Sequence, residues 1–310
     1  MYKLNYKKFI AVGLLLVMIF SVSGCKDKDK GLVARVDGEE ITEIQFNTEF
    51  EVYKKVYEQQ LGEGNLSQIA EDGRTIEENL RENIVEKLIM EVLIEKETTA
   101  QSIEVTPEEI KEQMDEYMAI MGGEEKFNEF LVNNQLTKEF FEENLRKELL
   151  FNKHRESFMN NTTITDEEAI EFFEANKDDL VVIKASHILL KSEEDGKKVL
   201  ERLNSGEDFA ELAKEVSIDK TSGLLGGSLG YFAKGNFIAE FEETAFALNV
   251  GETSGLVKTE VGYHIIYLED KKDSFEALKE DIISLLKDDK YLEKIQDMRN
   301  NAKVKIFLDL

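Results

Sequence analysis

The chain is poor in cysteine and histidine, with one cysteine, three histidines and no tryptophan among its 310 residues. The single cysteine, Cys25, excludes an internal disulfide. A chain without cysteine beyond this position suits an oxidising exterior, because no thiol is left to mispair. Cys25 itself therefore needs another explanation.

Basic residues are scarce relative to acidic ones. Lys and Arg number 39 against 65 Asp and Glu, so the formal net charge is −26. A surface this acidic repels phosphate backbones and anionic lipid headgroups, which argues against nucleic acid as a partner. It would attract basic unfolded chains, although solubility alone also explains it.

Long apolar runs are absent except near the N-terminus, where Phe9 to Val22 follows three lysines and precedes two small residues. This pattern predicts an export signal over residues 1–24. The run is short for a helix that spans a bilayer.

The stretch Val22-Ser23-Gly24-Cys25 resembles the lipobox of bacterial lipoproteins, whose cysteine receives a diacylglyceryl group and becomes the mature N-terminus. Two acyl chains suffice for stable anchoring. We therefore expect lipidation of Cys25, a solvated tether over residues 25–32, and a location on the outer face of the cell membrane. The alternative is an ordinary secretory signal in which Cys25 is incidental.

Residues 33–180 are predicted to form the N-terminal part of a helical chaperone domain, after a short strand at 33–36. Apolar residues recur at the helical period, and threonines followed three residues later by Glu or Gln mark helix starts. Aromatic and methionine side chains here form a core, which is the default, or line a groove for clients. The predicted starts lie at Thr42, Thr75, Thr106 and Thr165.

The pattern changes at residue 181, where a run rich in β-branched residues predicts a strand. Strands and helices alternate over residues 181–270, which indicates a small compact α+β domain. From residue 271 a charged amphipathic helix returns, and we expect residues 304–308 to pair with the strand near Val33. The fold class is therefore α+β, with a small antiparallel sheet flanked by helices inserted in a mostly helical domain that residues 271–310 complete. The inserted helices are expected over 194–204, 208–216 and 239–248, and the last strand over 262–268.

Residues 181–270 carry an ordered series of motifs and over their whole length resemble the parvulin family of peptidyl-prolyl cis-trans isomerases. The lipobox and helical flanks further resemble the PrsA foldase lipoproteins of Gram-positive bacteria. The principal motifs are Ala185-Ser186-His187-Ile188-Leu189, Phe209-Ala210-Glu211-Leu212-Ala213, Gly226-Gly227-Ser228-Leu229-Gly230-Tyr231-Phe232 and Thr259-Glu260-Val261-Gly262-Tyr263-His264.

This resemblance implies a catalytic group of four polar residues. His187 and His264 would lie side by side under the substrate, with Thr259 in their hydrogen-bond network. Asp219 occupies the position that cysteine or aspartate holds elsewhere in the family. No covalent step, metal ion or organic cofactor is implied.

The resemblance maps the proline pocket to Leu229, Phe237 and Phe241. Rotation about a prolyl amide faces a barrier of about 18–20 kcal/mol, which arises from its double-bond character. A dry apolar pocket would favour the less polar twisted amide. Asp219, placed near the carbonyl oxygen, would oppose the charge separation of the planar form.

Simpler interpretations of these residues stay open. His187 or His264 on a strand suits a satisfied core position, and Phe237 and Phe241 at helical spacing suit a core as well. A zinc site made from the two histidines and Asp219 is a further option, which their loose spacing disfavours.

Two departures limit what carries over from the family. Ser228 stands where parvulins commonly have aspartate, which would loosen that turn. Residues 191–195 hold three acidic residues and no arginine pair, whereas phosphate-specific parvulins use a basic cluster there. We therefore expect no dependence on substrate phosphorylation.

The predicted function is a foldase that isomerises X-Pro bonds in unfolded exported proteins and holds these clients in its helical domain. One alternative is a catalytically inactive chaperone or scaffold lipoprotein with the same clients. Another is a solute-binding lipoprotein, which shares only the lipobox. Homodimerisation through the helical domain is a family-level expectation that the acidic surface opposes.

Overall fold

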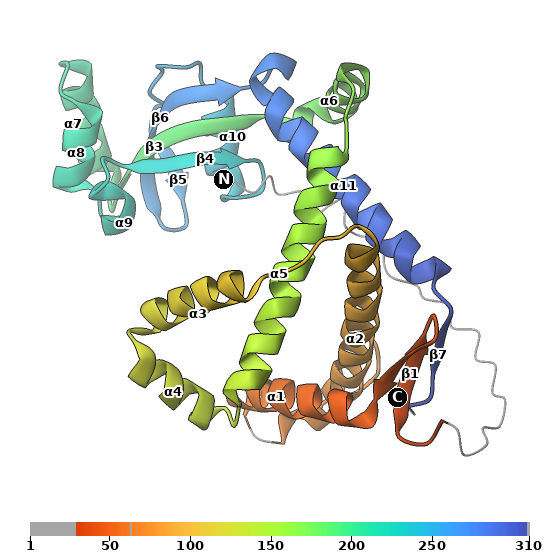
Figure 1. Ribbon diagram of the computed structural model, residues 1–310. Coiled ribbons are helices and arrows are strands. Elements are labelled where there is room, and N and C mark those ends of the chain that lie inside the picture. Colours follow the sequence, from red (N-terminus) through yellow and green to blue (C-terminus); the bar gives the residue numbers. More distant parts are fainter. Residues whose placement is uncertain (1–28, 63, 309–310) are drawn as a thin grey trace. The chain divides into compact units, whose positions relative to one another are not determined.

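The structure, a computed structural model, describes residues 29–62 and 64–308. These residues divide into two compact units, one made of residues 164–286 and the other of the residues before and after that range (Figure 1). The predicted signal peptide and Cys25 lie outside the described residues. In the described part of the chain, no helix is both long and apolar enough to cross a membrane.

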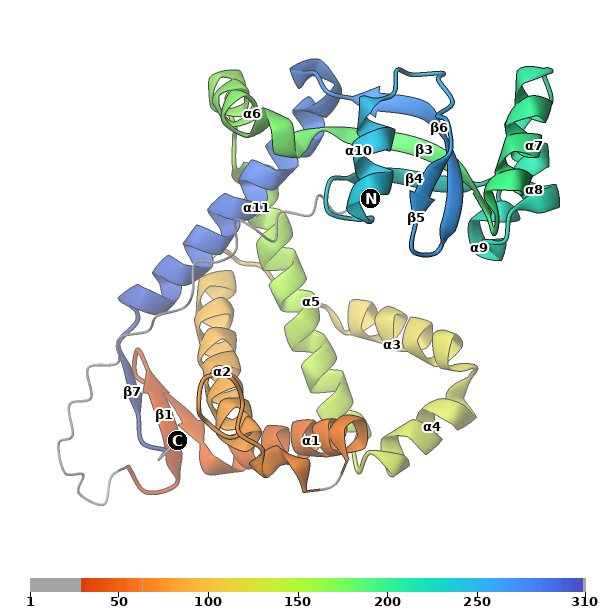
Figure 2. The same cartoon turned by 180° about the vertical axis from the view of Figure 1, so that it is seen from behind.

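The unit drawn from both ends of the chain is mostly helical and is called the helical unit below. Figure 2 shows its elements from behind. They are β1 (Leu32–Val36), β2 (Glu39–Thr42), α1 (Glu43–Leu61), the 3-10 helix η2 (Asn65–Ser67), α2 (Ile76–Ala100), α3 (Pro107–Met121), α4 (Glu124–Asn133), α5 (Lys138–Asn161), the second half of α11 (Phe275–Asn301) and β7 (Val304–Ile306).

Residues 32–42 and residues 304–306 meet in an antiparallel sheet with the strand order β2-β1-β7. Ala34 lies opposite Ile306, and the Phe307 amide donates to the Val33 carbonyl at 2.8 Å. The predicted pairing of residues 304–308 with the strand near Val33 is confirmed. The helical unit is therefore completed by residues that lie far apart in the sequence.

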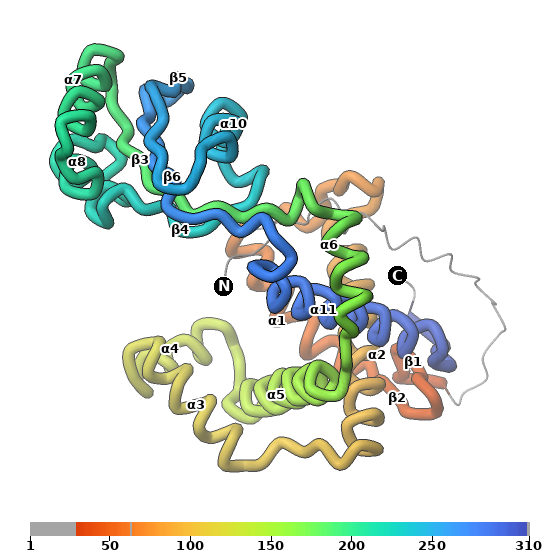
Figure 3. Tube along the Cα trace, turned by 90° about the horizontal axis from the view of Figure 1, so that it is seen from above, coloured from red at the N-terminus to blue at the C-terminus, as the bar shows by residue number. Residues whose placement is uncertain are grey.

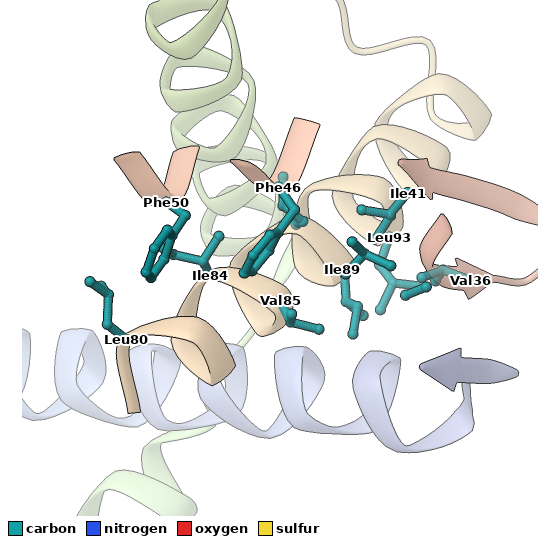
Figure 4. Packing of buried hydrophobic residues seen from close by; sticks show 12 residues of the cluster. Val36, Ile41, Phe46, Phe50, Leu80, Ile84, Val85, Ile89 and Leu93 are labelled. Atoms are coloured by element: carbon teal, nitrogen blue, oxygen red, sulfur yellow. The ribbon is translucent and has the colours of Figure 1, made fainter. Parts of the chain in front are cut away.

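The core of the helical unit lies between α1, α2 and this sheet (Figure 4). The rings of Phe46 and Phe50 from α1 stack at 5.8 Å. Full burial of a large apolar side chain stabilises a fold by about 1.5–3 kcal/mol, so this layer holds β1 against the helices. The buried residues that α2 contributes are Leu80, Ile84, Val85, Leu88, Ile89 and Leu93.

The helix starts predicted from threonine spacing are confirmed. Each threonine accepts a hydrogen bond from the amide three residues later, and the side chain at that later position bonds back to the threonine amide. A cap of this kind stabilises its helix by about 1 kcal/mol. The four capping residues are Thr42, Thr75, Thr106 and Thr165.

The second half of α11 is bonded to α2 and α5 inside the helical unit. The buried Tyr291 places its hydroxyl 2.9 Å from His154 Nδ1 on α5. Arg299 pairs with Glu86 of α2 at 2.6 Å. The third histidine of the chain therefore joins the C-terminal helix to the N-terminal half of this unit.

The other unit, called the sheet unit below, is built on an antiparallel sheet with the strand order β4-β3-β6-β5. The predicted isomerase domain, residues 181–270, lies inside it, and α6 and the first half of α11 belong to it as well. Its elements are α6 (Asp166–Leu180), β3 (Val182–Leu190), α7 (Glu193–Asn204), α8 (Phe209–Val216), α9 (Lys220–Gly223), β4 (Ser228–Ala233), α10 (Ala239–Ala247), β5 (Val257–Thr259) and β6 (Gly262–Lys272).

Helices cover both faces of this sheet (Figure 3). α7 and α8 pack over Ile188 and Ile265 on one face, and α10 packs over Ile266 on the other. Side chains alternate between the faces of a strand. His187 is next to Ile188 and His264 is next to Ile265, so both histidines point to the opposite face, which α10 covers.

Candidate active site

His187 and His264 come from the two central strands of the sheet unit. In the β3–β6 pair, His187 lies opposite Ile266 and Leu189 lies opposite His264, so the histidines are diagonal neighbours. Their Nδ1 atoms are 3.2 Å apart, and their rings stack with centroids at 5.4 Å. Both residues are buried, and 6% of His187 and 5% of His264 is exposed.

Two glycines allow the backbone to approach these strands. The His187 amide donates to the Gly227 carbonyl at 2.8 Å. A Cβ at Gly227, where φ is +86°, would lie 2.4 Å from the carbonyl oxygen of His187. A Cβ at Gly262, where φ is +145°, would lie 2.4 Å from the Leu190 carbonyl oxygen. These close contacts explain why glycine occupies both positions of the motifs around the histidines.

Asp219 reaches His187 from the segment that leads into α9. The Ile218 amide donates to the Leu189 carbonyl at 2.8 Å, which fixes this segment beside the end of β3. Asp219 Oδ1 caps α9 by accepting from the Thr221 amide at 3.0 Å. Its Oδ2 faces the site and lies 2.9 Å from His187 Nε2.

Ser222 completes this corner of the site, and none of the sequence motifs predicts its involvement. Its hydroxyl oxygen lies 2.6 Å from Asp219 Oδ2 and 3.0 Å from His187 Nε2, and 5% of the residue is exposed. The sequence signal that could have indicated Ser222 is its spacing from Asp219. A residue three positions after a helix-capping aspartate lies on the same side of the first turn.

Thr259 lies at the opposite end of the histidine pair. It belongs to β5, and its Oγ1 is 2.8 Å from His264 Nε2. The contacts form one continuous chain from Thr259 through His264 and His187 to Asp219.

Hydrogen-bonding capacity assigns a direction to this chain. An ionised Asp219 only accepts, so His187 carries its proton on Nε2 and accepts at Nδ1. His264 then donates from Nδ1 and accepts at Nε2 from the Thr259 hydroxyl. With neutral rings, this assignment gives each contact one proton and leaves no ring nitrogen unsatisfied.

The same contacts set the charges of the site. The Ser222 hydroxyl, followed by the His187 ring and the backbone amides of α9, lowers the pKa of Asp219 to about 2 despite partial burial. Burial, with His187 close by, lowers the pKa of His264 to about 4. At neutral pH the hydrogen-bond chain therefore contains a neutral His264 and ends at the ionised carboxylate of Asp219.

An apolar wall beside the histidines comes from α10 and the loop before it. Phe241 is 2% exposed, and its ring centroid lies 5.8 Å from that of His187 and 5.3 Å from that of His264. Phe237 lies 5.1 Å from Phe241 and is 37% exposed. Leu229 packs against the same cluster. Phe241 is therefore a core residue under the site, and Phe237 presents the accessible aromatic surface.

The structure brings the four predicted polar residues into one network and the three predicted pocket residues into one apolar cluster. Across residues 29–62 and 64–308, no group of three or more His, Cys, Asp or Glu side chains is arranged to hold a metal ion. Both ring nitrogens of His187 are bonded to other residues of the network.

Comparison with known proteins places this site in a family. The model of the PPIC-type PPIASE domain matches residues 187–270, and that of the SurA-like N-terminal domain matches residues 3–155. The foldase protein PrsA of Caldanaerobacter subterraneus subsp. tengcongensis is 33% identical over 95% of this chain and 98% of its own length. The foldase protein PrsA of Halalkalibacterium halodurans is 31% identical over 89% of this chain and 76% of its own length.

A solved structure of the peptidylprolyl isomerase PrsA from Bacillus anthracis is 28% identical, covers 73% of this chain and 100% of its own, and has a TM-score of 0.32. The family models and both PrsA relatives agree on one assignment. The chain belongs to the PrsA family of foldases and is a parvulin-type peptidyl-prolyl cis-trans isomerase.

Proposed function

We propose that the chain is anchored through Cys25 on the outer face of the cell membrane and isomerises X-Pro bonds in exported proteins. Asp219 acts on the substrate carbonyl. The Asp219 carboxylate is oriented by the chain of His187, His264 and Thr259. The reaction needs no covalent intermediate and no cofactor. The observation that supports the proposed isomerase mechanism is the continuous hydrogen-bond chain from Thr259 to the ionised Asp219.

Asp219 is suited to weaken amide resonance. The planar prolyl amide places partial negative charge on its carbonyl oxygen, and a carboxylate beside that oxygen disfavours this charge distribution. Lowering the barrier by about 4 kcal/mol would accelerate rotation roughly a thousandfold. The Asp219 side chain is 28% exposed, so a bound peptide can approach it from solvent.

The apolar cluster supplies the proline pocket in this proposal. Phe237 is exposed enough to contact a pyrrolidine ring, with Phe241 beneath it and Leu229 packed on the same cluster. A pocket of this kind excludes water from the amide, which favours the less polar twisted form.

The segment after β3 supports independence from substrate phosphorylation. Glu193 and Glu194 pair with Lys197 and Lys198 at 2.6 and 2.7 Å, so these lysine charges are already compensated. These ion pairs offer a phosphorylated substrate no net positive charge, so phosphorylation gives it no added attraction here. We expect a phosphoserine-proline peptide to react no faster than its unmodified form; a clear preference for the phosphopeptide would contradict this.

The helical unit is proposed to hold unfolded segments of the same clients. Ile120 of α3 and Val132 of α4 are 84% and 75% exposed, while Phe127 and Met114 of the same helices are buried. Exposed apolar side chains on these two helices together with the net charge of −26 suit weak binding of basic, partly apolar chains.

A protease-coupled proline-peptide assay on the wild type and on Asp219→Ala, run alongside aggregation suppression, tests the two roles. We expect Asp219→Ala to lose most isomerase activity and to keep suppression, because Asp219 lies in the sheet unit. Unchanged isomerase activity would overturn the assignment of Asp219. An inactive wild type that still suppresses aggregation would favour the chaperone-only alternative.

Anchoring through Cys25 is tested separately in bacterial cells. With a clickable fatty acid in the medium, the wild type should become labelled and sediment with membranes, and Cys25→Ser should do neither. A wild-type chain that stays unlabelled would contradict lipidation.

A further inference from the structure

We propose that Ser222 is a positioning residue of the isomerase site, whose hydroxyl fixes the Asp219 carboxylate and the tautomer of His187. The inference rests on the proposed catalytic role of Asp219. Ser222 belongs to none of the motifs on which the family resemblance was based, and its role follows from three contacts in the sheet unit.

These contacts form a closed triangle. Ser222 Oγ lies 2.6 Å from Asp219 Oδ2 and 3.0 Å from His187 Nε2, and the latter two atoms are 2.9 Å apart. The carboxylate only accepts, so the single hydroxyl proton of Ser222 points to Asp219 Oδ2. Ser222 Oγ then accepts from His187, whose Nε2 proton is shared between the hydroxyl and the carboxylate.

The backbone holds the Ser222 hydroxyl in this place. The Ser222 carbonyl accepts from the Leu225 amide at 2.9 Å and from the Gly227 amide at 2.8 Å. Gly227 in turn accepts from the His187 amide at 2.8 Å. The turn that carries Ser222 is therefore tied to the strand that carries His187, and their side chains keep a fixed separation.

The hydroxyl is not needed to cap α9. Asp219 Oδ1 already accepts the amides of Thr221 and Ser222 at 3.0 and 3.4 Å, which satisfies the first turn of this four-residue helix. Within the described residues, the side-chain hydrogen bonds of Ser222 lead only to Asp219 and His187. A purely structural role predicts that loss of the hydroxyl leaves these two residues unchanged, and a positioning role predicts the opposite.

Removing the hydroxyl should change the chemistry more than substrate binding. Asp219 Oδ2 would lose one of its two donors, so the carboxylate would become more basic, and this oxygen would be held by His187 alone. We expect Ser222→Ala to lower kcat about tenfold, as a difference of about 1.4 kcal/mol in barrier implies. KM should stay within about twofold, because the apolar cluster around Phe237 is not touched.

The test uses the full mature chain and a matched control. Ser254 is also 5% exposed. Its hydroxyl is bonded to backbone groups, since it accepts from the Ile266 amide at 2.9 Å and donates to the Gly255 carbonyl at 2.7 Å. Ser254→Ala therefore removes an equally buried hydroxyl outside the network. Ser222→Thr restores a hydroxyl and should recover most of the lost kcat.

Nitrogen-15 NMR of the His187 ring and carbon-13 NMR of the Asp219 carboxyl supply readouts that a structural role would not move. In Ser222→Ala we expect a weaker preference for the Nε2-protonated tautomer and a raised Asp219 pKa, with neither change in Ser254→Ala. A folded Ser222→Ala with wild-type kcat and unchanged spectra, beside an inactive Asp219→Ala, would overturn the role of Ser222 alone. Full activity of Asp219→Ala would instead overturn the proposed catalytic assignment.

Discussion

At the scale of single residues, the three histidines show that burial does not separate a core residue from a site residue. His154 is 2% exposed and bonds to Tyr291, which joins helices of the helical unit. His187 and His264 are almost as buried, but their hydrogen bonds lead to Asp219, whose carboxylate reaches solvent. A core histidine is therefore distinguished from a site histidine by the residue to which its hydrogen bonds lead, buried Tyr291 or partly exposed Asp219. These partners are far apart in the sequence and are identified only by the three-dimensional structure.

The stability of the sheet unit should fall as His264 becomes protonated in the unfolded chain. Burial lowers the pKa of His264 from 6.5 to about 4 in the folded protein. Between these values the unfolded state binds a proton that the folded state does not, so stability is fully present above pH 6.5 and decreases as the pH falls toward 4. The full contribution is about 3 kcal/mol.

Urea unfolding followed through the methyl NMR signals of Ile265 and Ile266 measures this effect in the sheet unit. The decrease between neutral pH and pH about 4 should be smaller in His264→Gln than in the wild type by roughly that amount. His154→Gln is the control, because it removes a buried histidine from the helical unit. Equal pH dependence in the wild type and His264→Gln would contradict the prediction.

At the scale of elements, local signals predicted the long helices, and contacts between distant segments decided the rest. Capping threonines and apolar periods act within a few residues, so the starts of α1, α2, α3 and α6 were predicted correctly. α9 has four residues and β5 has three, too few to show a period. The role of Ser222 also depends on where the chain returns at Gly227, which no local pattern of Asp219 and its neighbours specifies.

The glycine-rich turn before β4 offers a sharp test of close packing. Gly227→Ala would place a Cβ 2.4 Å from the His187 carbonyl oxygen at a φ of +86°. Gly230 has a φ of +68° with nothing within 4 Å of such a Cβ. We expect Gly230→Ala to cost about 1–2 kcal/mol from backbone strain alone. Gly227→Ala should cost more than that, because a backbone clash with β3 is added.

Thermal unfolding and the peptide isomerase assay together check this pair of variants. Gly227→Ala should melt at a lower temperature than Gly230→Ala and should lose activity even where it remains folded, because β3 carries His187. Equal melting temperatures and equal activities for the two variants would contradict this prediction. They would show that the backbone at residue 227 can move away from His187 without cost.

At the scale of the whole molecule, the helical unit is discontinuous in sequence and the sheet unit is inserted in it. The returning amphipathic helix and the strand at 304–308 predicted the insertion, whereas residues 164–180 and 271–286, predicted for the helical domain, belong to the sheet unit. The helical period shows which face of α6 or α11 is apolar, but it does not show which neighbour covers that face. Phe173 of α6 and Leu278 of α11 pack with Val182 of β3, so both helices extend the sheet unit beyond residues 181–270.

Because β7 closes the helical unit, a change in β7 should affect the proposed holding of clients without affecting catalysis. Ile306 lies opposite Ala34 and packs on the core of the helical unit, whereas the neighbouring Lys305 is exposed. We expect Ile306→Ser to destabilise the helical unit by about 1–3 kcal/mol and Lys305→Ser by at most about 1 kcal/mol, the value of the exposed contacts of Lys305 with Phe307 and Asp29. Both variants should isomerise a short proline peptide at the wild-type rate, since the network from Thr259 to Asp219 lies in the other unit. Aggregation suppression near the melting temperature should decline only in Ile306→Ser, and a parallel loss of isomerase activity would mean that the two units do not work independently.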